Sequence, residues 1–164
     1  MHTGPMTPAT VALDAAGVSY GVHEYERGEE LRGFGVEAAE QLGLDPDQVF
    51  KTLLVRVEGG SAPNDPVVVI APVSCSVSMK ATAGAVGGKR ATMCDPNDAE
   101  RITGYVVGGI SPLGQRKRLV TVVDESAELY DEIYVSGGRR GLDISVAPAA
   151  LIELLDAGVA DITG

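Results

Sequence analysis

The stretch from Gly43 to Val55 reads GLDPDQVFKTLLV and predicts a tight turn that leads into a buried strand. Asp45-Pro46-Asp47 is typical of a turn, because proline presets one backbone dihedral and aspartate bonds its own backbone. The strand is expected to run from Phe50 to Glu58. Side chains alternate between the two faces of a strand, so Lys51 points to the same side as Leu53, Val55 and Val57. The lysine therefore lies on the more apolar side, at the start of the strand.

Lys51 has two interpretations at this position. A lysine at the rim of a sheet commonly lays its apolar stem along the sheet and keeps its ammonium in water. The alternative is a cation at the mouth of a pocket, where reduced solvation strengthens its attraction to an anionic or polarised oxygen. The residue by itself leaves both interpretations open.

Helices and strands alternate on both sides of this strand. The uniformly apolar run Val67 to Ala71 predicts a central return strand. Thr7-Pro8 and Asp95-Pro96 are capping signals, which predict helices over 9–16 and 96–103 that end at glycines. Further helices are expected over 36–42, 78–86 and 149–157, and further strands over 19–25, 91–94, 105–107, 119–123, 133–135 and 144–146. This order indicates an α/β protein with a mixed sheet. With 164 residues, we expect a single compact domain over 6–164 after a loose leader, residues 1–5.

Composition and charge exclude several classes of protein. Hydrophobic residues make up 45% of the chain, which excludes disorder throughout, and the absence of Trp predicts an aliphatic core. A net charge of −10 argues against a general nucleic-acid coat protein and against binding to anionic membranes. The charge is uneven, however: residues 66–123 carry seven basic and three acidic side chains, whereas both flanks are strongly acidic. An acidic protein with a basic middle can still hold an anionic ligand locally.

Targeting signals and metal-site spacings are also missing. The sequence has no secretory signal and no apolar run of about 20 residues. Cys75 and Cys94 have no zinc-site spacing, so we expect two reduced structural thiols in a cytoplasmic protein. His23-Glu24-Tyr25-Glu26 is not the H-E-x-x-H of a metalloprotease. No metal and no cofactor are expected.

The loop from Gly108 to Arg118 is rich in glycine and basic residues. Gly109 and Gly114 have the spacing of a phosphate-binding P-loop, but Gln115-Arg116 replaces its Lys-Ser/Thr. The G-x-S-x-G pattern of a nucleophile elbow is broken as well, by Leu113. Either this is a flexible turn with solvated basic residues, or its backbone N–H groups approach a ligand whose phosphates contact the basic triplet.

A second loop, Ser136 to Asp143, repeats this composition. Its glycines flank Arg139 and Arg140, and Asp143 comes just before a strand. A β-turn with a capping aspartate is one interpretation. The other is a carboxylate that orients a lysine or accepts a hydrogen bond from a ligand amine. Together the two loops indicate a pocket for a polar, phosphate-bearing ligand.

Taken together, these segments resemble the YbaK family of free-standing aminoacyl-tRNA deacylases, which belong with the editing domain inserted in bacterial prolyl-tRNA synthetases. The resemblance runs from about Met6 to Ile162. It implies a single domain with a mixed, barrel-like sheet surrounded by helices, and it is greatest for the branch that removes cysteine from mischarged tRNA(Pro). The matching stretches are Met6-Thr7-Pro8-Ala9, His23-Glu24-Tyr25-Glu26, GLDPDQVFKTLLV (43–55), TGYVVGGISPLGQRKRL (103–119) and YVSGGRRGLDI (134–144).

The resemblance also implies a role for individual residues. Lys51 matches the family's essential lysine, at the ester end of the aminoacyl-tRNA. A G-x-x-x-P loop supplies backbone amides around the scissile carbonyl and the terminal ribose; its residues here are Gly108, Gly109, Ser111 and Pro112. The substrate pocket is expected to be lined by Tyr25, Phe34, Thr52 and Asp143. The basic residues expected to contact tRNA are Arg116, Lys117, Arg118, Arg139 and Arg140.

The mechanism implied by this family needs no nucleophile from the protein. The thiol of the substrate's own cysteine attacks its ester carbonyl, so the protein has only to position the chain and stabilise negative charge. An Ala-tRNA(Pro) deacylase of a sister branch and a non-catalytic module that binds tRNA or a synthetase are the alternatives. The expected partner is the acceptor end of aminoacyl-tRNA, with no DNA and no membrane; whether prolyl-tRNA synthetase presents the tRNA is left open.

Overall fold

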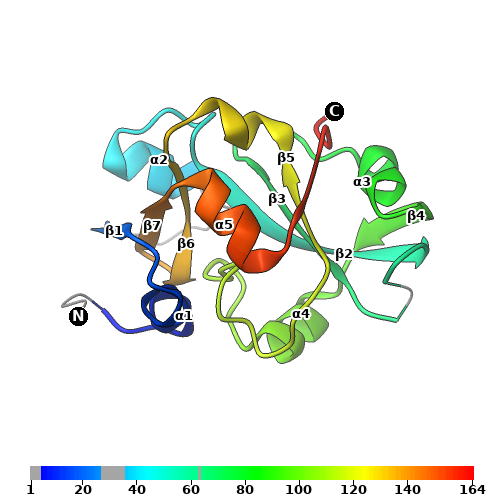
Figure 1. The fold of residues 1–164 in the computed structure, drawn as a ribbon, viewed down its shortest axis with the longest axis horizontal. Helices are drawn as coiled ribbons and strands as arrows, with labels where there is room; N and C mark the ends of the chain where they lie inside the picture. Colours follow the sequence, from blue (N-terminus) through cyan, green and yellow to red (C-terminus); the bar gives the residue numbers. More distant parts are fainter. Residues whose placement is uncertain (1–4, 27–35, 63) are drawn as a thin grey trace.

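The computed structural model describes residues 5–26, 36–62 and 64–164 and confirms a mixed α/β fold (Figure 1). Its strands form two sheets. The antiparallel three-stranded sheet has the order β1 (Tyr20–Glu24), β7 (Leu142–Val146), β6 (Ile133–Arg139). The five-stranded sheet has the order β4 (Gly88–Met93), β2 (Phe50–Gly59), β3 (Val67–Pro72), β5 (Thr121–Asp124), β8 (Gly158–Ala160), and its β3–β5 and β5–β8 pairs are parallel.

The strand β2 confirms the alternation expected from the sequence. Leu53, Val55 and Val57 belong to one apolar cluster, which is closed by α3 (Met79–Ala85). Phe50 and Leu54 point the other way, into a larger cluster. The five-stranded sheet is therefore buried on both faces, which explains why every residue of β3 is buried.

The larger cluster fills the space between the two sheets. The helix α5 (Pro148–Leu155) lies across this space in Figure 1, and its Leu151 is fully buried there with Ile133 and Ile144. The sheets also meet directly, because Val49 forms a bridge with Tyr134 and the Tyr134 N–H donates to the Gln48 carbonyl at 3.1 Å. This contact brings the start of β2 against β6.

The predicted caps begin and end two helices as expected. The side chain of Thr7 caps α1 (Pro8–Ala16), and that of Asp95 caps α4 (Pro96–Thr103). Gly17 and Gly104 end these helices with φ of 68° and 82°, values that favour glycine. The helix α2 (Val36–Leu42) has the expected bounds.

The segment 105–107 was expected to be a strand, and this prediction is wrong. The Tyr105 N–H donates to Thr103 Oγ1 at 3.2 Å, and the Val107 N–H donates to the Glu100 carboxylate at 2.7 Å. These groups bond locally instead of joining a ladder. The short elements β8 and η1 (Glu125–Leu129) were not expected, because a few residues carry too little periodicity. Among the residues described, no helix is both long and apolar enough to cross a bilayer.

Candidate active site

A small cavity of about 30 Å³ lies where the start of β2 meets the three-stranded sheet and the glycine turn that follows α4. The strands β2, β6 and β7, the residue that follows β1, and the loop after α4 all contribute to its lining. The described residues that line it are Tyr25, Phe50, Lys51, Thr52, Gly108, Ile110, Ser136 and Asp143.

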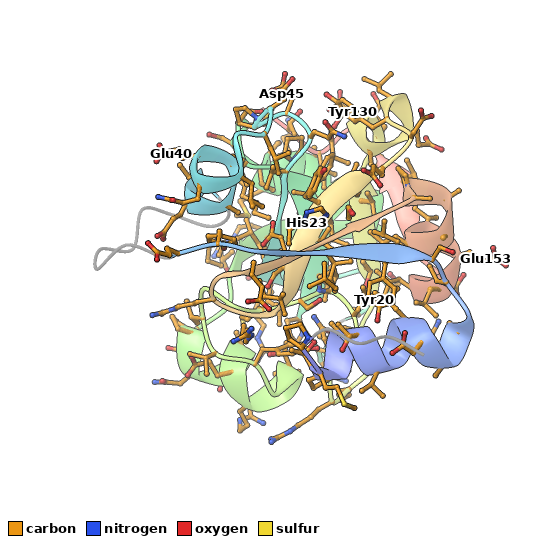
Figure 2. All side chains as sticks on the ribbon, turned by 90° about the vertical axis from the view of Figure 1, so that its left-hand side faces the viewer. Tyr20, His23, Glu40, Asp45, Tyr130 and Glu153 are labelled. Atoms are coloured by element: carbon orange, nitrogen blue, oxygen red, sulfur yellow. The ribbon has the colours of Figure 1, made fainter. Side chains whose placement is uncertain are left out.

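The wall supplied by the three-stranded sheet is polar. In its register, Asp143 pairs with His23 on one side and with Ser136 on the other, so these three side chains share a face. Leu142 and Ile144 point to the opposite face, into the core. Figure 2 looks onto this sheet from the side of β1, where the labelled His23 lies in the middle of the view. The sheet register therefore assembles polar groups from three strands beside the cavity.

Asp143 is buried in this wall, only 4% exposed. Within the described chain its carboxyl group has no hydrogen-bond donor. Burial raises the pKa of Asp143 to about 7. Burial and the nearby Asp143 charge together raise the pKa of Tyr25 to about 12. A carboxyl group kept from water without a partner is costly, and such groups concentrate at functional sites.

Thr52 brings a second unpartnered polar group to the same cavity. Its side chain is 5% exposed, and its Oγ1 has no hydrogen-bond partner among the described residues. Buried hydroxyl groups are nearly always hydrogen-bonded in folded proteins. This unsatisfied hydroxyl and the buried Asp143 carboxyl, on the walls of one cavity, indicate a site for a polar ligand.

Lys51 also lines the cavity, and its ammonium is bonded to the backbone. Its Nζ donates to the Cys75 carbonyl at 2.6 Å, in the segment between β3 and α3. Burial lowers the pKa of Lys51, and the neighbouring Cys75 opposes this shift. The lysine is thus partly desolvated and positioned by the backbone, which strengthens its effect on a nearby polarised oxygen.

The loop 108–112 presents Gly108 and Ile110 to the cavity, and its other residues support it. Gly108 lines the cavity, whereas the Gly109 N–H already donates to the Val106 carbonyl at 2.8 Å. Ser111 is fully buried, and its Oγ accepts from the Leu113 N–H at 3.2 Å. Pro112 lines a different cavity. Of the four loop positions expected to be catalytic, only Gly108 lies on the cavity.

Comparisons with known proteins identify the family. The model of the aminoacyl-tRNA editing domain matches residues 30–154. The chain is 39% identical, over 76% of its length and 74% of the relative, to EbsC of Enterococcus faecalis, whose name proposes a Cys-tRNA(Pro)/Cys-tRNA(Cys) deacylase activity. The chain belongs to the aminoacyl-tRNA editing domain family.

Other members and a solved structure agree with this assignment. The multifunctional Ser/Thr-tRNA deacylase ProXp-y of Escherichia coli is 32% identical over 67% of this editing domain and 65% of its own chain. A crystal structure described as a candidate trans-editing enzyme for prolyl-tRNA synthetase superimposes with a TM-score of 0.82, at 23% identity, over 96% of this chain and 95% of that one. The last comparison supports the fold.

The basic residues of this editing domain lie in two places. Arg139 and Arg140 border an open depression with Tyr25, so they are next to the candidate active site. Lys117 and Arg118 instead line a cavity beside α5, and Lys117 forms an ion pair with Asp65 at 2.8 Å. Arg116 packs over Gly104. Arg139 and Arg140, rather than the basic triplet, therefore border a depression that shares Tyr25 with the cavity.

Three lining residues were not expected from the sequence, namely Phe50, Ile110 and Ser136. Of these three, only Ser136 could have been inferred from the sequence, because it lies opposite Asp143 in the hairpin register. Phe34 lies outside the described residues. Within the described ranges, no group of three or more His, Cys, Asp or Glu side chains could hold a metal ion.

Proposed function

We propose that this editing domain is a trans-editing hydrolase that deacylates mischarged Cys-tRNA(Pro). The observation that carries the proposal is a small cavity lined by the buried Asp143 carboxyl, by Lys51, by Gly108, and by the Thr52 hydroxyl, which has no hydrogen-bond partner among the described residues. An aminoacyl ester has the complementary chemistry, because it carries an ammonium group and a polarised carbonyl a few bonds apart. The similarity to EbsC supports cysteine as the amino acid.

The cavity suits the two ends of an aminoacyl group. The buried Asp143 carboxylate accepts a hydrogen bond from the substrate's α-ammonium, because no described residue donates one to it. The ester carbonyl then lies between Lys51 and the Gly108 N–H, two donors that can stabilise negative charge.

The reaction uses the substrate's own thiol. Its sulfur attacks the ester carbonyl carbon and forms a C–S bond; the C–O bond to the terminal ribose breaks, and the thiol proton passes to the ribose oxygen. The products are tRNA with a free hydroxyl and a cyclic thioester, which water opens to cysteine. Lys51 and the Gly108 N–H stabilise the oxyanion of the tetrahedral intermediate, while the walls hold the chain in a reactive conformation.

The depression bordered by Arg139 and Arg140 suits the acceptor end of the tRNA. It adjoins the cavity through Tyr25, which lines both. The Arg139 guanidinium can form a strong, bidentate contact with phosphate there. Because the chain is otherwise acidic, selection of the tRNA falls to a second protein such as prolyl-tRNA synthetase.

The test is release of the amino acid from tRNA(Pro) charged with Cys, Ala, Ser or Pro, in the wild type and in Lys51→Ala. We expect rapid release of Cys and much slower release of Ser, because a hydroxyl is a weaker nucleophile than a thiol. Loss of an oxyanion donor costs about 10²- to 10³-fold in rate, so Lys51→Ala should lose activity by this factor and keep its fold. Lys89→Ala, which removes an exposed lysine from β4, is the control and should match the wild type.

Each contrary result has a definite meaning. Equal rates on Ser and Cys would exclude the substrate-thiol mechanism. Near-normal activity of Lys51→Ala would remove the lysine from the chemistry. Preferential release of Ala would assign the protein to the sister branch, and tRNA binding without release of any amino acid would make it a binding module.

A further inference from the structure

Both backbone polar groups of Val107 are held by charged side chains from different parts of the fold. Its N–H donates to Glu100 Oε2, on α4, at 2.7 Å. Its carbonyl accepts from Arg140 Nε at 3.1 Å and from Nη2 at 2.8 Å. Arg140 belongs to the turn between β6 and β7. Bonds to charged groups are stronger than those between neutral groups, so this residue is firmly held.

Val107 lies in the turn that carries Gly108 into the active site. The Gly109 N–H donates to the Val106 carbonyl and closes a four-residue turn, in which Gly108 has φ of 91°. This is the arrangement of a type II turn, whose third residue needs a positive φ. The central peptide of the turn joins the Val107 carbonyl to the Gly108 N–H.

The bond from Arg140 determines which way the Gly108 N–H points. In a planar trans peptide, the carbonyl and the following N–H point in opposite directions. Because the carbonyl points at Arg140, the Gly108 N–H points away from the guanidinium. Gly108 lines the cavity and Arg140 does not, and no described residue accepts a hydrogen bond from this N–H.

The same contact opposes the alternative form of the turn. A peptide flip, which converts type II into type I, exchanges the positions of the carbonyl and the N–H. The flipped N–H would then face the Arg140 guanidinium, donor against donor. Close packing adds to this restraint, since the nearest backbone atom of Arg139 is 2.8 Å from where a Cβ on Gly109 would lie.

We propose that Arg140, together with Glu100, is a positioning residue for the deacylation, which fixes the Val107–Gly108 peptide so that the Gly108 N–H faces the cavity as an oxyanion donor. The inference rests on the proposed function and adds to it. It gives Arg140 a role distinct from contact with tRNA, because the bonds to Val107 use Nε and Nη2 of the guanidinium.

The test compares Arg140→Gln and Arg140→Lys with the wild type over a range of Cys-tRNA(Pro) concentrations that reaches saturation. We expect Arg140→Gln to lower kcat by about 10- to 100-fold with KM unchanged, since a misplaced donor acts on the transition state. Arg140→Lys keeps one charged donor for the Val107 carbonyl and should recover part of the loss. The control is Arg90→Gln, which removes an exposed arginine that pairs with Glu58 on the adjacent strand. Its kcat should stay at the wild-type value.

A second measurement reports the conformation of the turn and does not depend on catalysis. The amide resonance of Gly108, followed by NMR in protein without tRNA, should shift and exchange faster in Arg140→Gln than in the wild type or in Arg90→Gln. If Arg140→Gln does not fold, Glu100→Ala and Glu100→Gln replace it. The alanine leaves the Val107 N–H without an acceptor and should lower kcat, whereas the glutamine keeps an acceptor oxygen and should restore it.

The contrary outcomes separate this inference from the proposed function. A raised KM with unchanged kcat and a weaker salt dependence would make Arg140 a phosphate contact and overturn the positioning role. Unchanged kinetics and an unchanged Gly108 resonance would overturn it as well. A wild-type protein that releases no amino acid from any charged tRNA would instead overturn the proposed function, and with it the catalytic part of the inference.

Discussion

Asp143 shows how strongly one residue's environment changes its chemistry. A surface aspartate is ionised at neutral pH, yet burial without a donor raises the pKa of this one to about 7. Near physiological pH, the Asp143 carboxyl in the cavity wall is therefore close to its change between the neutral and the ionised form. A bound ammonium would shift the balance toward the carboxylate, because an opposite charge nearby favours ionisation.

This burial predicts a pH-dependent stability that Asp143→Asn should remove. The pKa of Asp143 is higher in the folded protein than in the unfolded chain, where 3.8 is its ordinary value. Between these two values the folded state binds more protons. Stability should therefore fall as the pH rises from about 4 to about 7, by at most about 1.4 kcal/mol per pH unit.

Thermal unfolding of the wild type and of Asp143→Asn between pH 5 and pH 8 measures this effect. The difference in stability between the two proteins should change in favour of the variant as the pH rises, because asparagine never ionises. Parallel curves over the whole range would show that the carboxyl group is not buried as described.

At the scale of elements, the site depends on how closely the glycine turn approaches the β6–β7 hairpin. Gly108 and Gly109 lie against Arg139 and Arg140, and Gly138 lies against Tyr105. These contacts dock the segment after α4 onto the three-stranded sheet. A rigid support of this kind explains how a loop without regular structure can position a backbone donor.

Gly109→Ala tests this docking directly. The added methyl group would meet the backbone of Arg139 at 2.8 Å, where it cannot be accommodated without movement. We expect a loss of about 1–3 kcal/mol in stability and a lower kcat, since the turn must shift. Chemical denaturation and the Cys-tRNA(Pro) assay measure the two effects.

The matched control for this prediction is Gly84→Ala, on α3. A Cβ at Gly84 meets nothing within 4 Å, and alanine is the better helix former by up to about 1 kcal/mol. This variant should be as stable as the wild type or more so, with full activity. If Gly109→Ala behaved in the same way, the close approach would have no part in the site.

For the whole molecule, the decisive feature is an acidic chain with basic side chains beside the candidate active site. The net charge of −10 opposes general attraction to a polyanion. Arg139 and Arg140 give local attraction next to the cavity, although Glu24 lies 3.7 Å from Arg139. Binding of free tRNA should accordingly be weak and sensitive to salt.

Arg139→Gln tests whether this arginine provides local attraction for tRNA on an otherwise acidic protein. Removal of one phosphate contact should weaken binding to tRNA and reduce the slope of log K against log salt by about one. Arg90→Gln carries the same charge change far along the five-stranded sheet and should leave the slope unaltered. Titrations at several salt concentrations measure both. An unchanged slope in Arg139→Gln, or tight and anticodon-selective binding by the isolated protein, would contradict this picture.

Local patterns in the sequence determined most of the secondary structure. Thr7 and Asp95 cap helices as their neighbours predict, and β2 alternates as Phe50 to Val57 indicate. Such features depend on backbone preferences within a few residues. The segment 105–107 is the exception, because its backbone N–H groups bond to the side chains of Thr103 and Glu100, which local propensity does not register.

Only the tertiary structure decided which of the candidate residues meet. Lys51, Gly108 and Asp143 line one cavity because the Val49–Tyr134 bridge joins the sheets and the hairpin docks on the glycine turn. The same packing sends Pro112 to another cavity and turns Arg140 toward Val107, 33 residues away. Sequence patterns report the preferences of neighbouring residues, whereas these contacts arise from sheet register and the packing of distant segments.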